Sequence, residues 1–122
     1  MSSISPEILI VEDDEAIRES LADMLRDEGF TVASAENGLE ALGYLESHGA
    51  PCVIVLDLMM PVMSGPQFRE KQLADPRFAS IPVIVMSAAD LGSITAAQLH
   101  ANGFFPKPPD VDAMVATLTR FC

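Results

Sequence analysis

The sequence has few of the residues that mark secreted, membrane-spanning or nucleic-acid-binding proteins. Its 2 cysteines, Cys52 and Cys122, form neither a CxxC motif nor a metal-binding spacing, so the expected location is the reducing cytoplasm. No apolar run approaches the roughly 20 residues of a transmembrane helix, and the first residues carry no signal-like segment. Only 7 lysines and arginines stand against 18 aspartates and glutamates, a net charge of −11. This balance excludes the positive footprint of a nucleic-acid-binding protein and disfavours anionic membranes.

The chain has enough apolar material for one compact core. Its 122 residues are 49% hydrophobic, which argues against disorder and fits one domain better than two. We therefore expect a single domain over residues 1–122, with a core of about residues 6–121.

Short apolar runs alternate with helical patterns along the chain. Three of the runs are continuous and rich in Val and Ile, which is typical of parallel strands buried on both faces. The expected strands are Ile8–Val11, Phe30–Ala33, Cys52–Leu56, Pro82–Met86 and the weaker Gly103–Pro106. The expected helices run from the N-cap Asp14 to just before Gly29, around Leu39–Leu45, over Pro66–Leu73, over Ser93–Ala101 and from about Asp110. This alternation predicts an α/β fold with one sheet and helices on both faces.

Polar residues follow the strands at the points where the strands end. They are Glu12, Asp13 and Asp14 after the first strand, then Ser34, Asp57, Ser87 and Lys107 after the following four. One such residue alone is often a helix N-cap, but Asp57 precedes a loop that ends in Pro61, so capping explains it poorly. Because the carboxyl ends of parallel strands share one edge, we expect the set to meet there.

Several carboxylates at one edge need compensation. Two such charges about 5 Å apart repel by roughly 3 kcal/mol at an effective dielectric near 20, so either their pKa values rise or a cation joins them. Oxygen ligands favour a hard cation such as Mg²⁺, Mn²⁺ or Ca²⁺. A carboxylate can also be a nucleophile that forms an aspartyl-phosphate, whose charge an ammonium and a hydroxyl would stabilise.

Four motifs in order resemble the receiver domain of two-component response regulators, chemotaxis-regulator-like, over nearly the whole chain. They are Ile8–Asp14, Val55–Gly65, Pro82–Ala88 and Phe104–Pro108. The resemblance implies a doubly wound, five-stranded parallel sheet of flavodoxin-like order 2-1-3-4-5, with five helices on both faces.

The resemblance also implies a role for each site residue. Asp57 would be the phospho-acceptor, Lys107 would pair with the phosphoryl oxygens, and Ser87 would be the switch hydroxyl. Asp13 would bind Mg²⁺ or Mn²⁺ directly and Glu12 often through water, while Asp57 and the backbone carbonyl of Met59 complete the metal ligands. Phe104 stands where the family often has a switch tyrosine. A plain core role explains Phe104 almost as well, and any coupling through it must use packing. The Lys107–Pro108 bond would be cis.

The implied function is signalling rather than enzymatic turnover of a substrate. A histidine kinase or a histidine phosphotransfer protein would supply the phosphoryl group, and the domain would catalyse only its own phosphorylation and dephosphorylation. A downstream protein, or a second copy, would bind the face formed by the fourth helix, fifth strand and fifth helix; no nucleic acid or membrane partner is expected. The pathway and any effector beyond Cys122 stay open.

Other functions fit the residues less well. An aspartate-nucleophile phosphatase of the haloacid dehalogenase type needs a second Asp two positions after the first, where this chain has Met59. A flavodoxin-like cofactor module is rejected, because acidic Glu12, Asp13 and Asp14 would repel its phosphate. A receiver that has lost phospho-acceptance conflicts with the intact set of site residues. His48 and His100 are expected to be surface residues rather than phosphohistidines.

Overall fold

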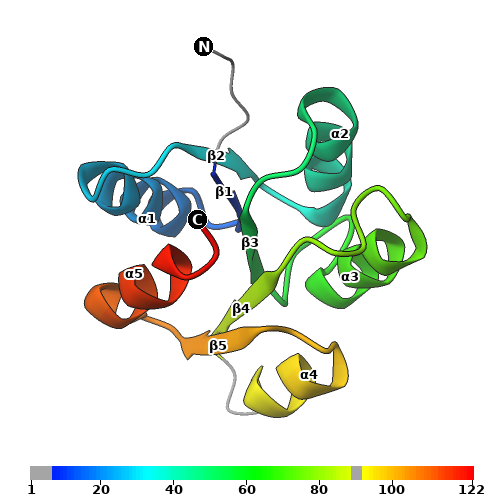
Figure 1. Ribbon diagram of the computed structural model, residues 1–122. Helices are drawn as coiled ribbons and strands as arrows, with labels where there is room; N and C mark the ends of the chain where they lie inside the picture. Colours follow the sequence, from blue (N-terminus) through cyan, green and yellow to red (C-terminus); the bar gives the residue numbers. More distant parts are fainter. Residues whose placement is uncertain (1–6, 89–91) are drawn as a thin grey trace.

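The computed structural model describes residues 7–88 and 92–122, so Pro6, the expected first core residue, lies outside the described residues. Strands and helices alternate along the chain (Figure 1). They are β1 Ile8–Val11, α1 Glu15–Asp27, β2 Val32–Ala35, α2 Gly38–His48, β3 Val53–Asp57, α3 Gly65–Ala74, β4 Val83–Ser87, α4 Gly92–Gln98, β5 Gly103–Pro106 and α5 Val111–Thr119. None of the helices in these described ranges is long and apolar enough to cross a membrane.

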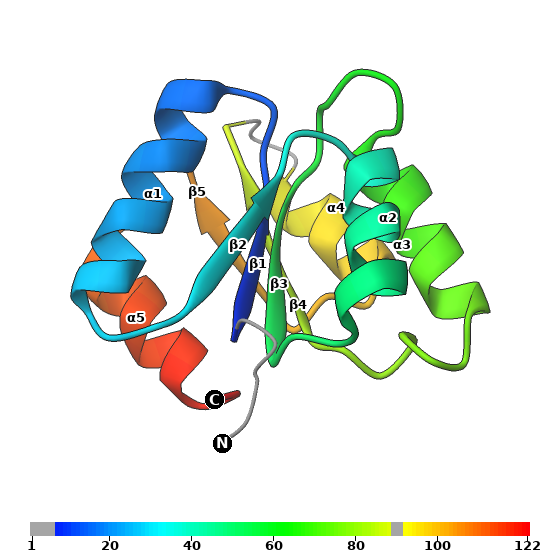
Figure 2. The ribbon, with the colours of Figure 1, turned by 90° about the horizontal axis from the view of Figure 1, so that it is seen from above.

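The five strands form one parallel sheet in the order β2-β1-β3-β4-β5, which confirms the predicted fold class and strand order. Helices α1 and α5 cover one face of the sheet, and α2, α3 and α4 cover the other (Figures 1 and 2). In this arrangement the order reverses between β1 and β3, where open α/β sheets place their ligands.

The central strands bury both of their faces. Leu9, Val11 and Ile54 pack into the cluster beneath α2, α3 and α4, whereas Ile8 and Ile10 pack into the cluster beneath α1 and α5. All five side chains are fully buried. Successive residues of each central strand point alternately into these two apolar layers, so the strands appear in the sequence as continuous apolar runs.

The second strand and the fourth helix differ most from their predicted bounds, whereas β3 and β4 are each shifted by one residue. The second strand begins at Val32 rather than Phe30, because Phe30 belongs to the turn that closes α1 and donates its N–H to the Leu25 carbonyl. Glu36 rather than Ser34 therefore follows this strand. The fourth helix ends at Gln98 rather than Ala101, because His100 adopts a φ of 56° that interrupts the helical path.

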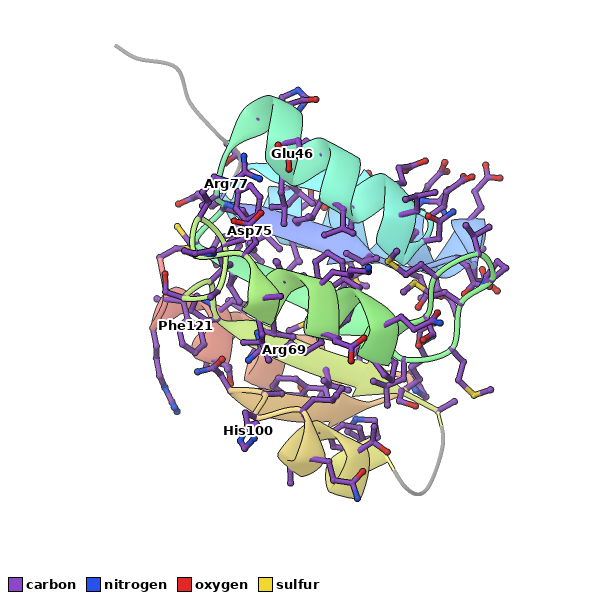
Figure 3. All side chains as sticks on the ribbon, turned by 90° about the vertical axis from the view of Figure 1, so that its right-hand side faces the viewer. Glu46, Arg69, Asp75, Arg77, His100 and Phe121 are labelled. Atoms are coloured by element: carbon purple, nitrogen blue, oxygen red, sulfur yellow. The ribbon has the colours of Figure 1, made fainter. Side chains whose placement is uncertain are left out.

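A buried arginine holds the end of α4. Arg69 on α3 is 5% exposed and donates to the carbonyls of Leu99 and His100, at 3.0 Å each. Its third partner is the Gln72 side chain at 2.8 Å. Burial lowers the pKa of Arg69, and the acceptors at the end of a helix dipole compensate its charge. Figure 3 shows Arg69 between α3 and the segment of His100.

Arg69 and Arg77 provide a matched test of this arrangement. We expect Arg69→Met to lower the free energy of unfolding by about 2 kcal/mol, because it leaves the carbonyls of Leu99 and His100 without this hydrogen-bond donor. Arg77→Met should have a much smaller effect, although Arg77 pairs with both Glu46 and Asp75, because exposed ion pairs contribute little. Urea denaturation of both variants measures the difference; an equal or larger loss for Arg77→Met would contradict it.

Candidate functional site

The sheet topology gathers the predicted site residues at one edge. A pocket of about 300 Å³ opens there, and its lining includes side chains from the ends of four strands. Asp57 pairs in register with Met86 on β4, and Ser87 pairs with Pro106 on β5. The N–H of Lys107 donates to the Ser87 carbonyl at 3.0 Å, so the lysine leaves the sheet directly beside β4. The pocket is lined by Glu12, Asp13, Asp14, Ile17, Asp57, Met59, Ser87, Ala88 and Lys107.

Three carboxylates in this pocket could hold a metal ion together. Ligand oxygens of Glu12, Asp13 and Asp57 all lie within 4.8 Å of one another. Glu12 is fully buried and Asp57 is 4% exposed, whereas Asp13 faces solvent. An all-oxygen donor set with one open side suits a hard divalent cation that keeps some of its water.

Lys107 is the counter-charge of the two buried acids. Its Nζ lies 2.5 Å from Oε1 of Glu12 and 3.2 Å from Oδ1 of Asp57. Oε2 of Glu12 accepts the Asp14 N–H at 3.0 Å. Oε1 accepts no hydrogen bond of standard geometry among the described residues, so its contact with Lys107 is an ion pair. That buried oxygen keeps capacity for a further cation.

The charges in the pocket perturb one another. Burial first, and then the charge of Glu12, raise the pKa of Asp57 to about 6, although Lys107 opposes the shift. Burial lowers the pKa of Lys107, but the carboxylates of Glu12 and Asp57 outweigh it, and the net shift is upward. Lys107 is therefore charged at neutral pH. Three carboxylates facing one ammonium leave an excess of negative charge that a divalent cation would neutralise.

The raised pKa of Asp57 predicts a pH-dependent stability of the metal-free protein. Its folded pKa of about 6 exceeds the unfolded value of about 3.9, so ionising Asp57 costs on the order of 2–3 kcal/mol at pH 7. This cost disappears as the pH falls from about 7 to about 4. In EDTA, Asp57→Asn should therefore be more stable than the wild type at pH 7, and the gap should close towards pH 4. Urea denaturation against pH measures it, and parallel profiles for the two proteins would contradict it.

The structure also places the other predicted residues. Ser87 is 3% exposed at the end of β4 and lines the pocket. Met59 lines it as well, with 74% of its surface exposed, and the role of its backbone carbonyl as a metal ligand stays a prediction. Phe104 on β5 is partly buried beneath α4 in the cluster of that face. The Lys107–Pro108 bond is cis, as the resemblance implies. His48 and His100 are exposed and lie outside the pocket lining.

Two residues at the site escaped the sequence analysis. Arg18 on α1 donates to the carbonyls of Glu12 at 3.0 Å and Asp13 at 3.4 Å, and so fixes the loop that presents both acids. The available signal was the position of Arg18 one turn into the helix that follows Glu12, Asp13 and Asp14. Gly65 lies against the backbone of Asp57 and Leu58, and nothing in the sequence apart from the motif itself indicated that contact.

The chain is thus a flavodoxin-like α/β domain whose doubly wound sheet carries an acid cluster and a lysine at its carboxyl edge. Residues 8–119 match the family model described as the response regulator receiver domain. The chain belongs to this family, the receiver domains of two-component response regulators.

Relatives support the same assignment. The chain is 38% identical over 112 residues to the response regulator Rre1 of Synechocystis sp., covering 89% of this chain and 48% of the relative. It is 37% identical over 117 residues to the response regulator MprA of Mycobacterium ulcerans, covering 94% of this chain and 49% of that relative. The chain thus spans about half the length of these curated relatives. The crystal structure of the chemotaxis protein CheY4 of Vibrio cholerae superposes with a TM-score of 0.84 at 26% identity, covering 98% of this chain and 100% of that one.

Proposed function

We propose that Asp57 accepts a phosphoryl group, with a bound Mg²⁺ or Mn²⁺ held by Glu12, Asp13, Asp57 and the carbonyl of Met59. The observation that carries this proposal is the pairing of a buried Asp57 with Lys107 at 3.2 Å in a pocket with two further acids. When bound, the metal supplies positive charge next to the transferring group.

Asp57, Lys107 and Ser87 have different roles in the proposed phosphoryl transfer. Oδ1 of Asp57 accepts the Leu58 N–H at 2.9 Å and contacts Lys107, so Oδ2 is the oxygen that we propose as the nucleophile. It forms a bond to phosphorus as the bond between phosphorus and the donor breaks, and the donor leaves with that electron pair. Lys107 stabilises the phosphoryl oxygens by its charge, and Ser87 would donate its hydroxyl to one of them. The domain would catalyse only this reaction and the hydrolysis of its product.

We further propose the partners and the setting of this reaction. Response regulators interact with histidine kinases, so a histidine kinase or a histidine phosphotransfer protein is the proposed donor, in the cytoplasm. The proposed output surface is the α4-β5-α5 face, for a protein target or a second copy. Phe104 supports this choice, because it packs beneath α4 while its strand pairs with β4, which ends in Ser87. Spectral shifts after phosphorylation that avoid this face would contradict the choice.

The same features support one receiver domain over residues 1–122. Both hydrophobic clusters lie against a single sheet, and the family match covers residues 8–119. The alternative phosphatase of the haloacid dehalogenase type is not favoured, because the family assignment is different and Met59 stands at the position of its second acid.

Incubation with acetyl phosphate and Mg²⁺, followed by intact mass, tests the proposed function. We expect one phosphoryl adduct, absent after addition of EDTA and absent in Asp57→Asn. Asp27→Asn, which removes an exposed acid at the end of α1, is the matched control and should keep the adduct. An adduct that survives in Asp57→Asn would refute the assignment of Asp57.

A further inference from the structure

The two cysteines of the chain meet at the end of the sheet opposite the phosphorylation site. The N–H of Cys52 donates to the Glu7 carbonyl at 2.8 Å, and Sγ of Cys122 approaches the same oxygen at 3.6 Å. The Glu7 carbonyl thus contacts both Cys52, just before β3, and Cys122, just beyond the end of α5. Figure 2 shows the end of the chain beyond α5 close to the starts of β1 and β3.

The side chains of the pair lie on the same side of the sheet. Cys52 is half-buried and packs against the cluster beneath α1 and α5, together with Phe121. Cys122 is exposed, and its N–H makes a long hydrogen bond of 3.3 Å to the Leu118 carbonyl of α5, so a small shift of its backbone would disturb that bond and leave the sheet intact. The chain has 2 cysteines in all, and hence no third thiol competes for either partner.

We propose that Cys52 and Cys122 form a reversible internal disulfide, with a low-molecular-weight disulfide such as oxidised glutathione as the oxidant. One protein thiolate attacks the oxidant and displaces a small thiol, which gives a mixed disulfide. The second protein thiol loses its proton to solvent, attacks the protein sulfur of the mixed disulfide and expels the second small thiol. The protein loses two electrons and two protons, and the oxidant is reduced to two thiols.

The local environment sets the conditions under which this disulfide forms. Although the residue is exposed as a whole, partial desolvation of its sulfur, the neighbouring Cys52 thiol and the charge of Glu7 raise the pKa of Cys122 to about 12. Cys122 is therefore protonated at neutral pH, and the reaction should accelerate as the pH rises. In a reducing cytoplasm the two thiols stay reduced, so the Cys52–Cys122 disulfide would form only when the small-molecule thiols of the cell become oxidised. The site lies apart from the acid pocket and does not depend on phosphorylation.

Intact mass after oxidation tests the proposal. Reduced protein is incubated with oxidised glutathione at pH 8.5, then denatured and blocked with N-ethylmaleimide. We expect a product about 2 Da lighter than the reduced protein, without glutathionyl or maleimide adducts, and a cross-linked peptide containing both cysteines. Cys52→Ser and Cys122→Ser are the matched controls, and each should keep a glutathionyl group on its remaining cysteine.

The competition between closure and a second glutathionylation separates a built site from chance encounter. Because the fold holds the thiols together, the ratio of internal disulfide to doubly glutathionylated protein should be at least about tenfold higher in the folded protein than in 8 M urea. A ratio in the folded protein equal to or below that in urea would overturn the proposal. Accumulation of glutathionyl adducts or of disulfide-linked dimers in the folded wild type, without the internal bond, would overturn it as well.

Discussion

Replacing Gly65 by alanine is expected to lower the free energy of unfolding by at least about 3 kcal/mol and to abolish phosphorylation by acetyl phosphate. A Cβ at this position would overlap the carbonyl oxygen of Asp57 and would lie 2.8 Å from Cα of Leu58. The Gly65 N–H also donates to the Leu58 carbonyl at 3.0 Å. The obstructing atoms are backbone, so either the start of α3 or the end of β3 must move, and the latter carries Asp57.

Gly43→Ala is the matched control for this variant. Gly43 lies inside α2, and a Cβ there meets no described atom within 4 Å. Because alanine favours the helix over glycine, this variant should gain about 1 kcal/mol. Urea denaturation and the intact-mass assay measure both substitutions. If Gly65→Ala keeps wild-type stability and phosphorylation, the close contact between the start of α3 and the backbone of Asp57 would be contradicted.

The positions of the site residues could be predicted because the buried strands are unambiguous in the sequence. β3 and β4 are each a run of apolar residues, and the polar residue that ends each run, Asp57 or Ser87, lies at the carboxyl edge by topology alone. β2 was harder to locate. Phe30 is aromatic and suits a strand by propensity, but the Gly29 turn, with φ of 101°, draws it into the closure of α1.

Features that depend on contacts across the fold escaped prediction. Arg69 lies on a helix whose sequence suggests an exposed charge, since arginine is almost never fully buried. The carbonyls that accept from Arg69 lie at the end of α4, far along the chain. They follow the helix because it is interrupted at His100, whose φ is 56°. Val62, in the loop after Asp57, adopts a φ of 68°, a conformation that β-branched residues rarely adopt. Propensity alone argues against that conformation.

Removing the ammonium of Lys107 is expected to move stability, metal affinity and phosphorylation in different directions. Lys107→Met leaves Glu12 and Asp57 buried without their counter-ion, so the metal-free protein should lose about 3 kcal/mol of stability at pH 7. The same loss of positive charge should tighten Mg²⁺ binding by at least about tenfold, because the cation no longer competes with an ammonium. Phosphorylation by acetyl phosphate should slow by about a hundredfold, since one stabilising charge on the phosphoryl oxygens is gone.

Lys71→Met is the matched control, because Lys71 is the other lysine of the chain and is exposed on α3. It removes the same charge and should change stability by less than about 0.5 kcal/mol, with Mg²⁺ affinity and phosphorylation rate unchanged. Urea denaturation in EDTA, calorimetric Mg²⁺ titration and the time course of the phosphoryl adduct measure the three effects. Tighter Mg²⁺ binding with slower phosphorylation cannot arise from partial unfolding, because unfolding would weaken both. Weaker Mg²⁺ binding in Lys107→Met would therefore remove Lys107 from the charge balance of the site.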